Sequence, residues 1–185
     1  MKKYLAPLAV LSIMTLTQPV FAADQFNIDP VHSWINFSVN HGGFAAAHGR
    51  FGEVTGTIDF DQDNVANSSV SVEIKATSID TNHEARNDHL KSPDFFNVAE
   101  FPKLTFNSTS IEKTGENTGL VTGELTMIGS TNLVTLDVTF NKIEGDKVGF
   151  SATAEITPGD FGMAKVAGFG MGPSVQISID LEAAK

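Results

Sequence analysis

The residues best suited to polar chemistry lie on one short segment in the middle of the chain. Asn82, Arg86 and His89 stand at positions i, i+4 and i+7, so in a helix they would share one face. An amide, a guanidinium and an imidazole on one face can hydrogen-bond a quinone carbonyl, an amide or a phosphate. The alternative is structural: Arg86 pairs with a neighbouring acid, and His89 bonds a loop carbonyl. Both interpretations fit the sequence.

The other histidines do not form a recognisable catalytic or metal site. His32 and Ser33 are adjacent, so on a strand they face opposite sides. His41 and His48 flank a glycine- and alanine-rich loop, but no third ligand follows at a spacing typical of zinc sites. With no cysteine in the chain, thiolate chemistry and disulfides are excluded. We therefore expect no metal, no cofactor and no catalysis, and His89 is the candidate acid/base if the protein is an enzyme.

These polar residues belong to the one segment that breaks a strand-like sequence. Thr81 and Glu84 match a capping box, which predicts a helix over residues 82–91 with Thr81 as its N-cap. Pro93 then opens a shorter turn that carries the aromatic pair Phe95-Phe96.

Elsewhere the chain alternates apolar and polar residues with a period of two, which indicates strands with one buried face. Eight strands enclose a space just wide enough for side chains or for one small ligand. The pattern predicts an all-β fold: an eight-stranded antiparallel barrel with a short helical insert between strands 3 and 4. The eight runs cover residues 35–39, 54–60, 70–76, 104–106, 121–127, 134–140, 148–156 and 175–181.

The inward-facing positions mix bulky and small side chains. The small ones are Gly56, Ala76, Gly123, Ala152 and Ala154. Either they leave volume for an apolar guest, or the glycines mark bulges and the alanines fit the taper of a filled core. If a cavity exists, we expect its wall to be formed by Ile35, Phe37, Val39, Ile58, Phe60, Ile74, Phe95, Phe96, Phe106, Leu125, Met127, Leu136, Phe140, Phe150 and Phe161.

The first residues predict export. Lys2 and Lys3 precede a short apolar run over residues 5–17, as in a secretory signal peptide covering residues 1–22. The run is too short to span a bilayer, which needs about 20 apolar residues. We expect a soluble periplasmic protein with one domain over residues 23–185, not an integral membrane protein.

The charge balance disfavours polyanionic partners. Removing Lys2 and Lys3 from 12 basic residues leaves 10 against 22 acidic ones, so the net charge changes from −10 to −12. That balance disfavours nucleic acid and anionic membrane surfaces, and it favours a ligand with a neutral head group.

Five motifs, in order and at matching spacing, resemble the YceI-like lipid/polyisoprenoid-binding family. They are D-x-x-H-S-x-I-x-F at residues 29–37, R-x-x-H-L-x-S-x-D-F-F at 86–96, an aromatic-P-x-x-x-F at 101–106, G-x-L-T-x-x-G at 123–129 and D-F-G at 160–162. The resemblance implies a lipocalin-like barrel with an apolar tunnel that holds a polyisoprenoid, an isoprenoid quinone or a fatty amide. It implies no catalytic activity.

Together these observations predict a protein that carries or sequesters an isoprenoid lipid or quinone in the periplasm. Two alternatives stay open: an enzyme acting on such a lipid with His89 as acid/base, and a ligand-free stress-response barrel filled by its own side chains. A homodimer is compatible with all three.

Overall fold

The computed structural model describes residues 23–185; the predicted signal peptide, residues 1–22, lies outside them. The described strands form one antiparallel sheet of 11 members. Its elements are β1 (Asp24–Ile28), β2 (Trp34–His41), β3 (Ala45–Phe51), β4 (Val54–Phe60), η1 (Val65–Asn67), β5 (Ser69–Lys75), η2 (Ala76–Ser78), β6 (Ile79–Asp80), α1 (Glu84–Lys91), β7 (Lys103–Lys113), β8 (Thr118–Met127), β9 (Ser130–Glu144), β10 (Lys147–Ile156), η3 (Pro158–Phe161), η4 (Ala164–Phe169) and β11 (Met171–Ala184).

The sheet closes into a barrel with eight strand positions, which we call staves. The count is eight and not 11 because three of the staves are each formed by two strands separated by an interruption. β1 and β2 both pair with β11, through Ile28↔Ala183 and Trp34↔Asp180. β3 and β4 follow each other along the next stave, where they pair with β2 and β1. β5 and β6 form the third stave, paired with β4 and β3. The predicted eight-stranded antiparallel barrel, with its helical insert between the third and fourth staves, is confirmed.

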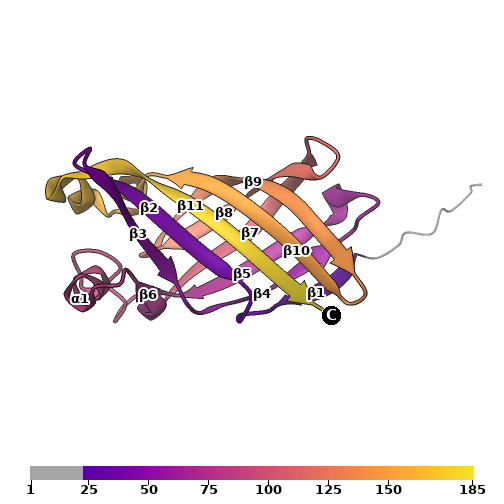
Figure 1. Cartoon of the computed structure of the whole chain (residues 1–185), viewed down its shortest axis with the longest axis horizontal. Coiled ribbons are helices and arrows are strands. Elements are labelled where there is room, and N and C mark those ends of the chain that lie inside the picture. The colour runs from indigo at the N-terminus through magenta and orange to yellow at the C-terminus, as the bar shows by residue number, and fades with distance from the viewer. Residues whose placement is uncertain (1–22) are drawn as a thin grey trace, which may run out of the picture.

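The barrel has two different ends (Figure 1). We call one the helix end: it carries α1, η3, η4 and the β2–β3 turn. We call the other the turn end: it carries the β4–β5, β7–β8 and β9–β10 connections and the C-terminus. Among the described residues, no helix is long and apolar enough to cross a membrane.

The local structure around α1 differs from the prediction. The helix begins at Glu84, and its N-cap is His83, whose side chain accepts a hydrogen bond from the Arg86 N–H at 3.2 Å. The prediction that Thr81 is the N-cap is wrong. Asn82 lies in the left-handed region with a φ of 58°, so it precedes the helix and does not share its face. Asn87, not Glu84, bonds Thr81: its side-chain oxygen accepts from the Thr81 N–H and hydroxyl at 2.8 and 2.6 Å.

Three strands were not predicted: β1, β3 and the two-residue β6. β1 is a short segment that pairs with β4 and the end of β11. β3 occupies residues 45–51, the first three of which were predicted to be loop. Its sequence, with three alanines and a glycine, carries little of the bulky alternation by which a strand is recognised.

Two interior glycines make room for aromatic rings. A Cβ at Gly123 would lie 2.4 Å from the Phe106 ring and 2.6 Å from the Asn107 carbonyl oxygen. A Cβ at Gly49 would lie 2.2 Å from the Phe37 ring. Of the five small inward residues, Ala152 and Ala154 line the internal cavity described below, whereas Gly123 instead permits close ring packing.

Candidate functional site

The barrel encloses an apolar cavity of about 540 Å³ that runs along its axis. Its lining reaches from Phe169 and Met171 at the helix end to Asn117 and Thr118 at the turn end. The alternation of the strands directs their apolar side chains inward, and these side chains leave the axis open. Of the predicted wall residues, the cavity is lined by Ile35, Phe37, Val39, Ile58, Phe60, Ile74, Phe95, Phe96, Phe106, Leu125, Met127, Leu136, Phe140 and Phe150. Phe161 is buried but lies outside the lining.

Towards the turn end the wall holds three mutually packed aromatic rings. The centroid of Phe60 lies 5.5 Å from that of Phe140 and 5.3 Å from that of Phe150, and the latter two are 5.8 Å apart. Such contacts stabilise aromatic groups beyond their area burial. Glu112, Lys113 and Glu116, which the sequence analysis did not include, line the cavity where it meets the β7–β8 connection.

At the helix end, His89 lies between two phenylalanines. Its ring is edge-on to Phe95 at 4.9 Å and to Phe169 at 5.5 Å between centroids, and all three line the cavity. Phe169 belongs to η4, so this contact joins the insert after β6 to the loop before β11. We call these two segments, which meet over the axis at this end of the barrel, the cover.

Asp94 reinforces that junction. Its carboxylate pairs with Lys165 of η4 and lies 3.7 Å from the His89 Nε2 atom. The hydrogen bond and charge of Lys165 lower the pKa of Asp94 below its ordinary value, and His89 adds a smaller effect. Asp94 thus links the turn after α1 to η4 and to His89 of α1.

The predicted polar residues do not all gather at the cavity. Arg86 and His89 line the axial cavity, whereas Asn82 lines only a surface groove beside β3. Thr81 fixes the Arg86 guanidinium: Nε donates to its hydroxyl at 2.8 Å and Nη2 donates to its carbonyl at 2.6 Å. The cavity lining also includes His48, which the sequence analysis treated only as a metal candidate. Its place depends on β3, the strand that lacked a clear signal.

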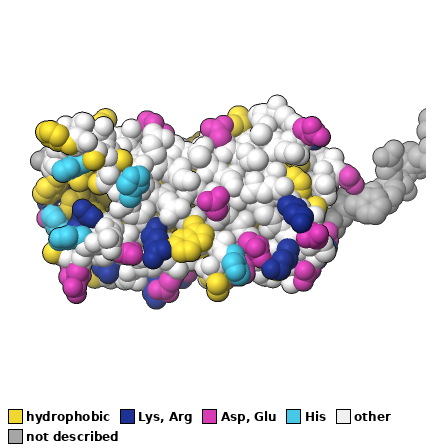
Figure 2. Space-filling model, viewed as in Figure 1, with side chains coloured by type: hydrophobic (Ala, Val, Ile, Leu, Met, Phe, Trp, Pro, Cys, Tyr) yellow, Lys and Arg dark blue, Asp and Glu magenta, His cyan; other side chains and the backbone are white. Residues whose placement is uncertain are grey.

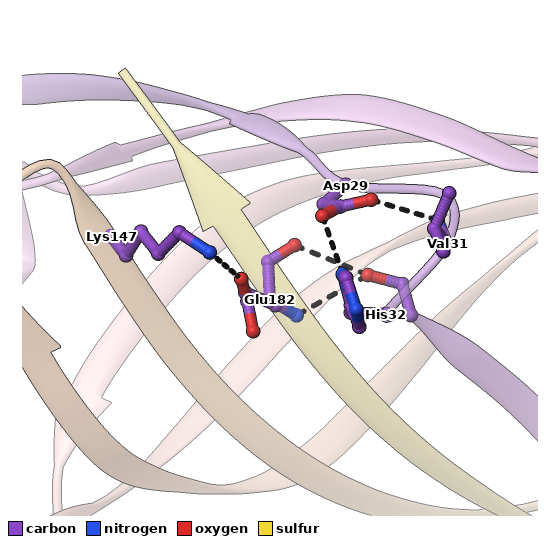
Figure 3. Close-up of polar contacts among 6 residues, drawn as sticks. Asp29, Val31, His32, Lys147 and Glu182 are labelled. Carbon is purple, nitrogen blue, oxygen red and sulfur yellow. Dashed lines mark hydrogen bonds and ion pairs between the residues drawn. The ribbon is translucent and has the colours of Figure 1, made fainter.

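A second polar cluster lies where β1 gives way to β2 (Figure 3). His32 Nδ1 lies 2.8 Å from an Asp29 carboxylate oxygen, and the Val31 N–H donates to the other oxygen at 2.8 Å. The hydrogen bond between Asp29 and His32 lowers the pKa of Asp29 and raises the pKa of His32. Ser33 exchanges hydrogen bonds of 3.2 Å with the backbone of Glu182 in β11.

This cluster has a spacing that could hold a metal ion, because ligand atoms of Asp29, His32 and Glu182 lie within 4.8 Å of one another. Its existing contacts point to a structural role. The Glu182 carboxylate already pairs with Lys147 at 2.6 Å, and the ammonium group opposes a cation there. The cluster fastens the interrupted first stave to β11, which closes the barrel (Figure 3).

A closed up-and-down barrel with an apolar axial cavity defines a lipocalin-like protein. Within that class, the YceI-like domain matches residues 26–183, and the chain belongs to this family. A UPF0312 protein of Pseudomonas syringae pv. tomato is 35% identical over 188 residues, covering 98% of this chain and 95% of its own. The protein YceI of Escherichia coli O157:H7 is 39% identical over 168 residues, covering 87% of each chain.

Solved structures share the fold. Burkholderia cenocepacia BcnA superposes with a TM-score of 0.77 at 25% identity, covering 84% of this chain and 98% of its own. A polyisoprenoid binding domain from Saccharophagus degradans, implicated in plant cell wall breakdown, superposes with a TM-score of 0.70 at 15% identity, covering 86% of this chain and 97% of its own.

Proposed function

We propose that this protein binds an amphiphilic isoprenoid lipid, either a polyisoprenoid or an isoprenoid quinone, and carries or sequesters it in the periplasm. The axial cavity is the observation that carries the proposal. Its volume of about 540 Å³ falls within the roughly 300–1,000 Å³ typical of ligand pockets. The periplasmic location rests on the signal peptide predicted for residues 1–22.

The physical basis is the burial of the ligand tail. Removing apolar surface from water is worth about 25 cal/mol per Å², so each isoprene unit contributes roughly a few kcal/mol before ordering costs. The wall offers aliphatic and aromatic side chains along its length, with hydrogen-bond donors from Arg86 and His89 at the helix end. The similar Saccharophagus domain, described as polyisoprenoid-binding, supports the same ligand class.

Co-purification tests the proposal. The chain would be produced with its own first 22 residues, and the purified protein extracted with organic solvent for mass spectrometry. We expect one isoprenoid compound at close to one molecule per chain. Repeated preparations without a stoichiometric apolar compound would refute carriage.

Two neighbouring residues on β10 provide matched variants. Ala154 lines the cavity, whereas Thr153 is exposed on the opposite face of the strand. Ala154→Phe places a ring in the ligand's space, and Thr153→Phe adds the same ring outside. We expect the first variant to lose the bound lipid and the second to retain it; equal lipid content in both would contradict binding in this cavity.

A further inference from the structure

The barrel wall is incomplete beside β3. β2 pairs with β3 over its whole length, from Ala45 to Phe51. On the other side, β6 pairs with β3 only at Arg50↔Asp80 and Phe51↔Ile79. The chain then leaves the sheet through Thr81 and Asn82 towards α1. Residues 45–49 therefore have no strand neighbour on their outer edge within the described part of the chain.

A surface groove lies along this incomplete part of the wall. It is lined by Asn36, His41, Ala45, Ala46, Ala47, His48, Gly49, Arg50, Asp80, Thr81, Asn82 and Arg86. Ala47, His48, Thr81 and Arg86 line both this groove and the axial cavity. The two spaces therefore adjoin at these residues. Figure 2 shows hydrophobic side chains in a hollow at the helix end, with histidine and Lys or Arg side chains around it.

The groove gathers two arginines and two histidines on an acidic protein. Arg50, Arg86, His41 and His48 face it in a chain whose net charge is −10. Among the described residues of the lining, Asp80 is the single acidic one, and three donors engage its carboxylate. They are the Asn82 N–H at 2.9 Å, the Asn87 amide at 3.3 Å and the Arg50 guanidinium at 3.5 Å.

Several donors in the groove keep hydrogen-bonding capacity that the other described residues do not use. Thr81 anchors Arg86 through Nε and Nη2, which leaves Nη1 without a hydrogen bond among the described residues. The His48 side chain forms no hydrogen bond or ion pair with any other described residue. Arg50 lies 4.9 Å above the ring of Trp34, the chain's single tryptophan. Arg86 Nη1 and the His48 ring are therefore available to an anionic oxygen acceptor, with the Arg50 guanidinium shared between Asp80 and the Trp34 ring.

We propose that the ligand's head group is anionic, a phosphate or a carboxylate, and that it leaves the barrel sideways between β3 and residues 81–86 to lie in this groove. The tail occupies the axial cavity, so the inference rests on the proposed function. The two ends of the axis suit an anion less well. The turn end presents Glu112 and Glu116 beside Lys113, and the helix end carries Asp94, whose carboxylate already pairs with Lys165 next to His89 and Phe169. The net charge favours a neutral head group only if charge is spread evenly over the surface, whereas the described lining of the groove holds two arginines against one acidic residue.

Two probes with one tail separate head-group binding from tail binding. Geranylgeranyl phosphate and geranylgeraniol would be titrated into lipid-free protein, with calorimetry for affinity and Trp34 fluorescence for occupancy of the groove. We expect Arg50→Gln and His48→Gln each to reduce the preference for the phosphate by about tenfold, the usual worth of one charge-assisted hydrogen bond. Affinity for the alcohol should stay unchanged in Arg50→Gln, because Arg50 lines the groove and not the axial cavity, and Arg50→Lys should retain most of the preference.

Lys142→Gln is the control, because it removes one positive charge at the turn end, where Lys142 pairs with Glu144. It should leave the preference intact. Three outcomes overturn the groove assignment while lipid binding stands: no phosphate preference in the unaltered protein, equal weakening of both probes by the groove variants, or loss of preference only in His89→Gln. If neither probe binds the unaltered protein, the proposed function fails and the groove assignment fails with it.

Discussion

The two ends of the barrel are built from the same sheet but differ in how completely their strands are paired. Towards the turn end, the wall holds the Phe60–Phe140–Phe150 cluster, and buried Phe26 lies against β4. At the helix end, residues 45–49 of β3 have no strand neighbour on one edge among residues 23–185, and the cover depends on contacts between α1, its following turn and η4. We propose that regular strand pairing supplies stability, whereas the interrupted end supplies access and selectivity. Four predictions test that division.

The largest expected effect is on folding, at the turn end. Phe26 is fully buried and does not line the cavity. Phe26→Ala should lower the free energy of unfolding by about 3–5 kcal/mol, measured by urea denaturation, while the remaining folded protein keeps its lipid. The matched change at the helix end is Phe44→Ala, because Phe44 is 93% exposed and should cost almost nothing. Equal destabilisation would break the proposed division.

The next effect compares two glycines that each accommodate a phenylalanine ring. Gly123→Ala should cost about 1–3 kcal/mol of stability, because the added Cβ meets the Asn107 backbone as well as the Phe106 ring. At Gly49 the nearest atoms all belong to the Phe37 ring, which borders the cavity. Gly49→Ala should therefore cost less stability but reduce lipid content, as Phe37 moves into the ligand's space. Denaturation and extraction from both variants decide the order.

A smaller, kinetic effect is expected at the cover of the helix end. Asp94→Asn removes the charge that Lys165 and His89 share. An exposed pair is worth roughly 1 kcal/mol or less, so the bound lipid should dissociate up to about fivefold faster. Stopped-flow displacement would measure the rate. Glu144→Gln, which breaks the Lys142 pair at the turn end, is the control and should leave dissociation unchanged.

The smallest effect is the pH dependence of barrel closure at Asp29 and His32. The folded-state pKa of His32 is raised above its ordinary 6.5, so its contribution to stability is complete below that value and is lost as pH rises through the folded pKa. The pKa of Asp29 is lowered from 3.8, so its contribution is present above 3.8 and is lost as pH falls through the folded pKa. His32→Ala should therefore destabilise the protein more at about pH 5.5 than at about pH 8.5. Urea midpoints at both values would show it, and a pH-independent difference would assign the residue no ionic role.

The regular wall was predictable because its information is local. A period of two along each strand determines which side chains face inward, so residues such as Phe60, Phe140 and Leu125 were assigned to the wall from the sequence and do line the cavity. Phe161 was assigned to the wall on the same hydrophobic character, but it belongs to a 3₁₀ turn, where no alternation operates.

The polar residues were harder to place because their neighbours are distant in the chain. The spacing of Asn82, Arg86 and His89 predicted one helix face, but the left-handed backbone of Asn82 removes it from that face. Arg50 carried no signal at all, since its contacts are with Trp34 and Asp80 on other strands.

Composition and periodicity by themselves determined that this chain forms an eight-stave barrel with an apolar interior and a helical insert, because alternation acts within each strand. Only the tertiary structure decided that three staves are interrupted, that residues 45–49 of β3 lack a second strand neighbour within the described part of the chain, and that His48 and Arg86 both line the groove beside them. Strand pairing brings together residues far apart in sequence, and where a pairing stops depends on the whole closed sheet.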